Sequence, residues 1–456
     1  MPQVMTLQHL PAEPPGPRRG LPGSTLLAFR RDPLRFLAQV QARHGDVARF
    51  RIGPRRFYLL AHPDHVQDVL VTRNRNFIKS LALQKARVLL GEGLLTSEGD
   101  HHLRQRRMSQ PAFHRQRIAE YGAVMAELAG GADARWGDGQ VVDVAREMNR
   151  LALAIAGRTL FGVEVAGEAD EIGRALDDAL QLYTRLSNPF AFLLDRLPVP
   201  GTVRMKRARE RLDATIYRII AEARRRGDAE ERGDLLSLLL TARDDEGDGA
   251  AMDDVQLRDE ALTLFLAGHE TTANALAWTW HLLGAHPQVA ETLRAELSAA
   301  LGGAPVTAAD VPRLPYTRAV LAESMRLYPP AWAIGRQPLE DFEIGGFTVR
   351  AGSVVLMSPW LTQHDPRFFA DPDRFDPGRW TTEMEAGLHR YAYFPFGGGP
   401  RKCIGEHFAW MEGIVVLATL ARRWRLHPVP GHAVRTEPRI TLRPLGGLPM
   451  RAERIT

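Results

Sequence analysis

The chain has 456 residues, 25% of them charged and 45% hydrophobic, a composition typical of a globular protein with one large domain or two ordinary ones. The 59 basic and 54 acidic side chains leave a net charge of +5, too small to predict nucleic-acid binding, although a basic face for an acidic partner is compatible with it. The only cysteine, Cys403, permits no internal disulfide, which fits a reducing compartment.

The first residues are predicted to form a tail. Residues 1–25 are rich in proline and arginine, as in Pro14–Gly20, and the segment lacks the hydrophobic run of a signal peptide or membrane anchor. No run of about 18 apolar residues, the length of a spanning helix, occurs elsewhere. We therefore predict a tail over residues 1–25, one folded domain over residues 26–456, and a cytoplasmic protein.

Short elements follow the tail. Apolar spacing predicts a helix over residues 33–44 and another over about 63–71, with a hairpin between them whose strands cover 47–51 and 57–60 around a Gly53-Pro54 turn. Further along, strands at 342–344, 347–349 and 353–357 predict a small antiparallel sheet.

The remaining N-terminal half shows little chemistry. Gly91 and Gly93 lack the third glycine and the preceding strand of a dinucleotide site, which argues against one there. Residues 115–245 are predicted to be helical, interrupted by an apolar loop at 189–194. That loop either caps a hydrophobic pocket or belongs to the core.

A cluster of cations lies at His101–Arg107. The simplest interpretation is a solvated helix face. However, His102 and Arg106 are four residues apart, so they share one helical face and together could grip a carboxylate.

The longest predicted helix, over residues 253–284, breaks helix rules in its middle. Glycine, a carboxylate and two hydroxyls interrupt its apolar run at Leu266–Thr272, and such violations tend to mark functional sites. Ala267 and Gly268 leave space for a planar ring, while Thr271 and Glu270 could handle water and protons. Two alternatives are a zinc hydrolase, excluded because Ala273 stands where the second histidine of His-Glu-x-x-His belongs, and a Thr271 that only bonds its preceding turn.

The stretch Phe396–Gly405 surrounds Cys403 with glycine. A lone cysteine is usually a small buried hydrophobe. Here the glycines allow a tight turn and a close approach to a flat cofactor, and a helix predicted from Glu406 would point its positive end at the sulfur, conditions that favour a metal-bound thiolate. Arg401 would supply a fixed cation near the cofactor's acidic edge.

The spacing F-x-x-G-x-R-x-C-x-G around Cys403 resembles the haem-binding loop of the cytochrome P450 family, the haem-thiolate monooxygenases. A-G-x-E-T-T at residues 267–272 is similar to that family's oxygen-activating helix, and Glu323-x-x-Arg326 to its E-x-x-R pair. The resemblance implies a mainly α fold with a smaller β region, a single triangular domain around a buried haem b (iron protoporphyrin IX).

The resemblance also implies roles for individual residues. Cys403 would ligate the iron, and Glu270 and Thr271 would be catalytic. The implied cofactor-binding residues are Cys403, His102, Arg106, Arg336, Arg401, Phe396, Ala267 and Gly268. A buried triad that braces the haem loop would consist of Glu323, Arg326 and Arg374.

The implied activity follows from the iron ligand. Thiolate ligation favours cleavage of the O–O bond of dioxygen, so one oxygen atom would enter a C–H or C=C bond of an apolar substrate. Phe265, Leu266, Trp332 and Ile334 favour a fatty acid, terpenoid or carotenoid, and the sequence faintly resembles bacterial carotenoid hydroxylases. The alternatives are a peroxide-driven peroxygenase of the same fold and a non-enzymatic haem sensor.

Electrons are expected from a separate partner, because the chain after Cys403 leaves no room for a flavin or iron–sulfur module. We predict a ferredoxin or flavodoxin with its NAD(P)H reductase, and a monomeric enzyme. The cations predicted to form the docking surface are Lys402, Arg104, Arg107, Arg422 and Arg423.

Overall fold

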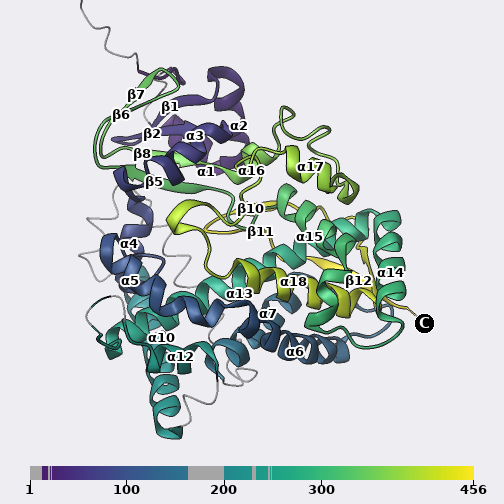
Figure 1. Ribbon diagram of the computed structural model, residues 1–456. Helices are drawn as coiled ribbons and strands as arrows, with labels where there is room; N and C mark the ends of the chain where they lie inside the picture. Colours follow the sequence, from purple (N-terminus) through teal and green to yellow (C-terminus); the bar gives the residue numbers. More distant parts are fainter. Residues whose placement is uncertain are drawn as a thin grey trace, which may run out of the picture. The chain divides into compact units, whose positions relative to one another are not determined.

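The computed structural model describes residues 13–18, 21, 23–162, 200–227, 233–244, 247 and 249–455 (Figure 1). The apolar loop predicted at residues 189–194 lies outside them. The chain forms two compact units, each assembled from segments far apart in the sequence. The first unit comprises Met1–Leu81, Ala333–Ala370 and His389–Lys402, and the second comprises Ala82–Trp332, Asp371–Leu388 and Cys403–Thr456.

A five-stranded sheet forms the centre of the first unit. Its strand order is β1 (Val47–Ile52), β2 (Arg55–Leu60), β8 (Val354–Met357), β5 (Ile334–Pro338) and β3 (Phe77–Lys79). β2 and β8 are parallel, and the other neighbouring strands are antiparallel. The predicted β1–β2 hairpin is confirmed, and Gly53 has the positive φ of 59° that its turn needs.

The prediction for the next strands was partly wrong. β6 (Phe342–Ile344) and β7 (Phe347–Val349) form a two-stranded hairpin, as expected from the Gly345-Gly346 turn between them. β8, however, joins the five-stranded sheet instead of this hairpin. Pairing with the distant β2 buries all four β8 residues, which the hairpin alone would leave half exposed.

Short helices flank this sheet. They are α1 (Ser24–Arg31), α2 (Pro33–His44), α3 (Pro63–Gln67) continued by the π-helical turn η1 (Asp68–Thr72), η2 (Asn74–Asn76) and α16 (Pro359–Gln363). α2 buries Leu34, Leu37 and Val40, which recur on one helical face. Asp32 accepts a hydrogen bond from Arg35 N (3.0 Å) and so caps the helix.

Part of the predicted tail belongs to this unit. Arg49 N donates to Pro15 O (2.8 Å), the Arg49 guanidinium donates to Pro14 O (2.8 Å), and Glu13 pairs with Arg49 (3.0 Å). A Cβ at Gly16 would lie 1.8 Å from Arg49 O. Residues 13–16 therefore lie directly along β1, one of the two edge strands, and cover backbone groups that would otherwise face solvent.

The second unit is mainly helical. Its helices are α4 (Leu81–Leu90), which begins at the boundary, α5 (Gly99–Ser109), α6 (Arg115–Ala132), α7 (Val144–Phe161), α10 (Pro200–Arg226), α12 (Leu235–Thr241), α13 (Asp254–Ala285), α14 (Pro287–Leu301), α15 (Pro315–Leu327), α17 (Thr382–Gly387) and α18 (Glu406–Ala421), with the short turns η3 (Gln110–Phe113), η4 (Asp133–Arg135), η5 (Ala308–Arg313) and η6 (Pro377–Arg379). α13 packs against α7, α15 and α18, as the labels in Figure 1 show. The fold class predicted from the sequence, mainly α with a smaller β region, is confirmed.

α13 is the helix predicted over residues 253–284, confirmed to within one residue. Asp253 and Gln256 form a capping box at its start. Most of its side chains are buried on every face, which is why the helix is apolar nearly throughout. Among the described residues, no helix is both long and apolar enough to cross a membrane.

Two small sheets complete the second unit. One contains β4 (Val141–Asp143), β12 (Pro449–Arg454) and β9 (Trp424–Pro428), and the other is the hairpin of β10 (Thr436–Pro438) and β11 (Leu442–Pro444). The hairpin is tied to α13, because Trp278 Nε1 donates to Leu442 O (3.0 Å).

Candidate functional site

The glycines before Cys403 adopt the backbone conformations predicted for a tight loop. Gly397 and Gly399 have φ values of 70° and 66°, in the left-handed region that favours glycine. A Cβ at Gly399 would lie 1.8 Å from Leu70 O. Gly399 also begins the 3₁₀ turn η7 (Gly399–Arg401), and Lys402 N donates to its carbonyl oxygen (3.0 Å).

Cys403 lies just before the first turn of α18. Its side chain is exposed, and a Cβ at Gly405 would lie 4.0 Å from its Sγ and 3.7 Å from the Phe113 ring. Gly405 is the N-cap, and Ala409 N donates to its carbonyl oxygen (2.8 Å). The positive end of α18 therefore begins two residues after the sulfur, which favours the thiolate over the thiol.

α5 carries the predicted carboxylate-binding pair. His102 is buried, with Nδ1 3.2 Å from Leu94 O and 3.4 Å from Ser97 Oγ. A proton on Nδ1 satisfies Leu94 O, so Nε2 can donate to a propionate only when the ring is an imidazolium. Burial lowers the pKa of the Arg106 guanidinium, while the negative charge of Cys403 raises it, so this cation lies within electrostatic reach of the thiolate.

The polar middle of α13 is less buried than the residues directly before and after it. Ala267 is exposed and Gly268, Glu270 and Thr271 are half-buried, whereas the flanking residues are buried. A Cβ at Gly268 would meet Leu160 at an ordinary 3.5 Å. The Thr271 hydroxyl donates to Ala267 O (2.8 Å), which is the bond expected if Thr271 only hydrogen-bonds to its preceding helical turn. This bond leaves the oxygen lone pairs of Thr271 as acceptors for a ligand or water.

Glu270 has a partner that the sequence did not reveal. Thr441, between β10 and β11, donates its hydroxyl to Glu270 Oε1 (2.6 Å) and receives a hydrogen bond from Asn274 Nδ2 (3.1 Å). Thr441 and Glu270 are 171 residues apart, so no local pattern links them.

The bracing triad forms, with one residue corrected. Glu323 and Arg326 are fully buried and make two hydrogen bonds of 2.8 and 2.9 Å. The second arginine is Arg379, whose Nε donates to Glu323 Oε1 (2.8 Å). The prediction of Arg374 was wrong, because its side chain is exposed and only its carbonyl oxygen accepts a bond from Arg326 (3.1 Å). The turn η6 carries the chain back so that Arg379, not Arg374, reaches the carboxylate.

Three predicted cofactor-binding residues belong to the first unit. Arg336 lies on β5, is 9% exposed, and donates to Gly335 O (3.0 Å). Phe396 and Arg401 are half-buried in the glycine-rich loop. Their contacts with a cofactor remain predictions.

The cations predicted to form the docking surface differ in their exposure and in the ion pairs and hydrogen bonds they make within the protein. Arg104 and Arg107 both pair with the buried Asp244, at 3.3 and 2.9 Å. The Arg104 side chain is only 17% exposed, so it is a poor docking cation. Arg423 is exposed and donates to Gly130 O (3.0 Å), and the half-buried Arg422 donates to Ala304 O.

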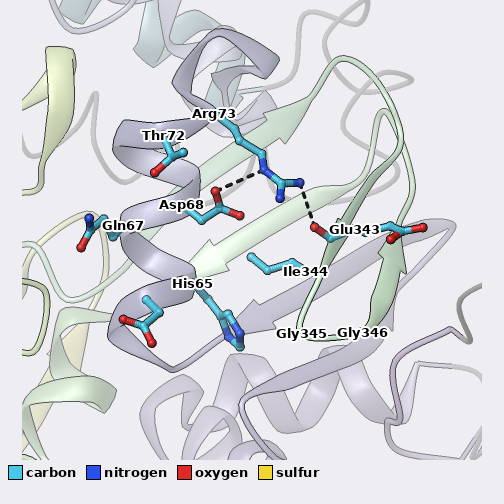
Figure 2. Close-up of a pocket in the computed structure, with 10 residues that line it drawn as sticks. His65, Gln67, Asp68, Thr72, Arg73, Glu343, Ile344, Gly345 and Gly346 are labelled. Atoms are coloured by element: carbon cyan, nitrogen blue, oxygen red, sulfur yellow. Dashed lines mark hydrogen bonds and ion pairs between the residues drawn. The ribbon is translucent and has the colours of Figure 1, made fainter.

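A pocket of about 540 Å³ lies elsewhere, wholly within the first unit (Figure 2). Its walls come from α3, η1 and the β6–β7 hairpin. Arg73 spans it, pairing with Asp68 (3.2 Å) and donating to Glu343 O (2.9 Å). The pocket is polar and includes none of the predicted site residues. It therefore does not match a site for an apolar substrate.

The second-unit residues fit a haem held by sulfur. The donor set is one exposed thiolate at a helix N-terminus, and no cluster of three or more His, Cys, Asp or Glu that could hold a metal ion occurs among the described residues. Ala267 is exposed in the middle of α13 between buried segments, and Arg106 supplies a half-buried cation within electrostatic range of Cys403. Fold and site together define a haem-thiolate protein.

Comparison with known proteins agrees with this class. The family model for cytochrome P450 matches residues 14–448. The chain therefore belongs to the cytochrome P450 family, whose cofactor is a haem bound through a cysteine thiolate.

Relatives and solved structures refine the comparison. The chain is 42% identical to cyclooctatin synthase and 43% identical to cyclooctat-9-en-7-ol 5-monooxygenase, both from Streptomyces melanosporofaciens, covering 93% and 90% of this chain and 92% and 88% of the relatives. Pentalenene oxygenase from Streptomyces avermitilis is 36% identical, with 89% of each chain covered. The P450DA haem domain has a TM-score of 0.88 at 28% identity, with 98% of this chain and 99% of that chain covered. The protein is a cytochrome P450 monooxygenase.

Proposed function

We propose that this enzyme hydroxylates or epoxidises a terpenoid, using haem b, dioxygen and electrons from a separate carrier. The observation that carries the proposal is the Glu270-Thr271 pair beside the exposed Ala267, in a chain 43% identical to cyclooctat-9-en-7-ol 5-monooxygenase. That relative and pentalenene oxygenase are named for oxygenation of an unsaturated alcohol and an alkene. Of the substrate classes considered from the sequence, these names favour a terpenoid over a fatty acid or carotenoid.

Each site residue has a defined task in this proposal. Cys403 would hold the iron, and His102, Arg106 and Arg336 would hold the propionates. A bound haem with a thiolate ligand would bind dioxygen and promote cleavage of its O–O bond. Thr271, whose proton goes to Ala267 O, accepts a hydrogen bond from a protonated ligand or a water, and Glu270 exchanges protons with solvent.

Terpenoid alkenes have few polar groups, so the protein can bind them mainly through apolar contacts. Phe265 and Trp332, which the sequence suggested as pocket residues, are 2% and 8% exposed and belong to the core. Phe265 packs edge-on against Phe161 (5.4 Å between ring centroids), and Trp332 Nε1 donates to Arg439 O (2.9 Å). We infer that these residues shape the wall behind the substrate, so that their truncation would change the position of attack.

The electron donor in this proposal is a small acidic ferredoxin or flavodoxin with its NAD(P)H reductase, and the enzyme acts as a cytoplasmic monomer. Arg422, Arg423 and Lys402 are the docking cations that Asp244 does not engage. Arg423→Glu should slow reduction at low salt and have little effect at high salt, because surface attraction is screened. Arg104→Glu should instead destabilise the fold, because it places a second carboxylate against the buried Asp244.

Turnover under isotopically labelled dioxygen tests the proposal. Purified enzyme with a surrogate ferredoxin, its reductase, NAD(P)H and a panel of terpenoid alkenes and alkenols should give a product carrying one atom of ¹⁸O from ¹⁸O₂. The reduced carbon monoxide complex should show the red-displaced band of cysteinate-bound haem. Turnover with hydrogen peroxide but none with dioxygen and NAD(P)H would identify a peroxygenase, and the spectral band without any turnover would identify a haem sensor.

Thr271→Ala separates oxygen-driven from peroxide-driven chemistry. The variant should form at least about tenfold less product from dioxygen, a lower bound on the roughly 10²–10⁴-fold that a positioned acid–base group contributes, while more of the consumed NAD(P)H appears as hydrogen peroxide. Product formation with added peroxide should persist. Unchanged coupling of NAD(P)H to product would remove Thr271 from the proposed mechanism.

A further inference from the structure

Thr441 connects the C-terminal hairpin to the acid on α13. It lies between β10 and β11, is 5% exposed, and donates its hydroxyl to Glu270 Oε1 over 2.6 Å. This is a short bond for a hydroxyl donor, as expected where the acceptor is charged. It is also the contact that determines where the Glu270 carboxylate lies.

A third residue takes part in this hydrogen-bond chain. Asn274 Nδ2 donates to the Thr441 hydroxyl oxygen (3.1 Å). The Glu270 carboxylate can only accept, so the single proton of the Thr441 hydroxyl points at Glu270 while the hydroxyl oxygen accepts from Asn274. Glu270 and Asn274 are one helical turn apart on the same face of α13, and Thr441 lies between their two ends.

The hairpin holds Thr441 in place. Leu442 N donates to Pro330 O (2.9 Å), and Trp278 Nε1 donates to Leu442 O (3.0 Å). On the other side, Arg439 N donates to Thr441 O (3.0 Å), and Trp332 Nε1 donates to Arg439 O (2.9 Å). Two buried tryptophans therefore fix the backbone on both sides of Thr441.

We propose that Thr441 is a positioning residue of this monooxygenase. It keeps Glu270 Oε1 as a permanent acceptor, so the exchangeable proton of Glu270 resides on Oε2. Among the described residues, Oε2 makes no hydrogen bond. Oε2 can therefore release a proton toward the site and take up another from bulk water, so that the protonation state of Glu270 is restored after each transfer. This inference rests on the proposed role of Glu270 in proton transfer.

The test compares oxygen-driven and peroxide-driven turnover in hairpin variants. Thr441→Val keeps the side-chain shape and removes the hydroxyl, and should lower the yield of product per NAD(P)H oxidised about tenfold, at an unchanged KM, since a misplaced acid loses most of its contribution. Peroxide-supported turnover and the carbon monoxide spectrum should not change. Thr441→Ser should restore coupling, and Thr436→Val makes the same substitution on the same hairpin as a matched control and should resemble wild type.

A double-variant cycle separates this inference from the proposed function. In a Glu270→Gln background, Thr441→Val should cause no further loss of coupling. If Glu270→Gln alone leaves coupling unchanged, the proposed role of Glu270 is wrong. If Glu270→Gln lowers coupling while Thr441→Val leaves it unchanged, or lowers it equally in both backgrounds, the positioning role of Thr441 is overturned.

A readout independent of turnover completes the test. In a crystal structure of Thr441→Val, the Glu270 carboxylate should rotate away from the hairpin while the α13 and β10–β11 backbones stay in place. A carboxylate that remains within hydrogen-bond distance of its wild-type position would contradict the proposal.

Discussion

Two glutamates show how differently this protein holds a carboxylate. Glu323 on α15 is fully buried and accepts at least five hydrogen bonds from the described residues. Arg326 donates two (2.8 and 2.9 Å), and Arg379 Nε (2.8 Å), Trp380 Nε1 (2.9 Å) and Asp376 N (3.1 Å) donate the others. Every lone pair is engaged, so this carboxylate has no site left for a proton.

Glu270 on α13 is the opposite case. It is half-buried, and its side chain accepts one hydrogen bond among the described residues, from Thr441. One donor is enough to orient a carboxylate but leaves the other oxygen available for proton exchange. A carboxylate whose oxygens accept hydrogen bonds at every lone pair therefore indicates a structural role. A carboxylate that accepts a single hydrogen bond, at an interruption in a helix, indicates a group that can react.

Removing the charge of Glu323 should have the largest effect on stability. Glu323→Gln leaves the buried Arg326 and the partly buried Arg379 with an incomplete partner, and should lower the free energy of unfolding by about 3–5 kcal/mol. Urea denaturation followed by tryptophan fluorescence measures this. Glu340→Gln at the surface serves as the control and should stay within about 0.5 kcal/mol of wild type. A similarly small effect at Glu323 would mean that the brace does not stabilise the fold.

The corrected third member of the brace gives the next largest effect. Arg379→Ala removes one charged hydrogen bond to Glu323 and should cost about 1.5–3 kcal/mol. Arg374→Ala is the matched control, because the exposed Arg374 uses only its carbonyl oxygen, and it should cost no more than about 0.5 kcal/mol. Equal losses in the two variants, measured by urea denaturation, would contradict the assignment of Arg379.

These two arginines also show where the sequence was informative. The spacing around Cys403, the polar break in α13 and the Glu323–Arg326 pair are local patterns, and the structure contains each of these local features. Choosing between Arg374 and Arg379 depends on the η6 turn, whose path is set by tertiary packing.

The contacts that the sequence could not predict join distant segments. Thr441 meets Glu270 across 171 residues, and Arg107 meets Asp244 across 137. Similarly, the apolar run of β8 predicts a buried strand but not its partners, because the same strand pairs parallel with β2 and antiparallel with β5. Side chains that only tertiary packing brings together, as Thr441 and Glu270 are, fall outside what sequence motifs describe.

A third carboxylate, Glu412 on α18, extends the comparison to a buried group with few hydrogen-bond donors around it. Burial raises its pKa well above the usual range, and the neighbouring Thr272 hydroxyl opposes this only in part. The unfolded chain loses this proton near pH 4.5, whereas the folded protein retains it to higher pH. The contribution of Glu412 to stability is therefore fully present at low pH and is lost as the pH rises toward its folded pKa.

Glu412→Gln should remove this dependence. From about pH 5 upward, wild type should lose stability relative to the variant by up to about 1.4 kcal/mol per pH unit, until the folded pKa is reached. Urea unfolding of both proteins at several pH values measures the difference. A constant difference across that range would show that Glu412 ionises as easily in the folded protein as in the unfolded chain.

Glu270→Gln should have the smallest effect on stability and a large one on chemistry. The glutamine keeps an oxygen that accepts from Thr441, and the site is only half-buried, so the free energy of unfolding should change by less than about 1 kcal/mol. Product formed per NAD(P)H oxidised should nevertheless fall, because an amide cannot take up and release a proton as the Oε2 atom of a carboxylate can. Denaturation and coupling measured on the same preparation separate the two effects. A loss of stability approaching that of Glu323→Gln would give Glu270 a structural role like that of Glu323. The number of hydrogen bonds that a carboxylate accepts would then no longer indicate whether it reacts.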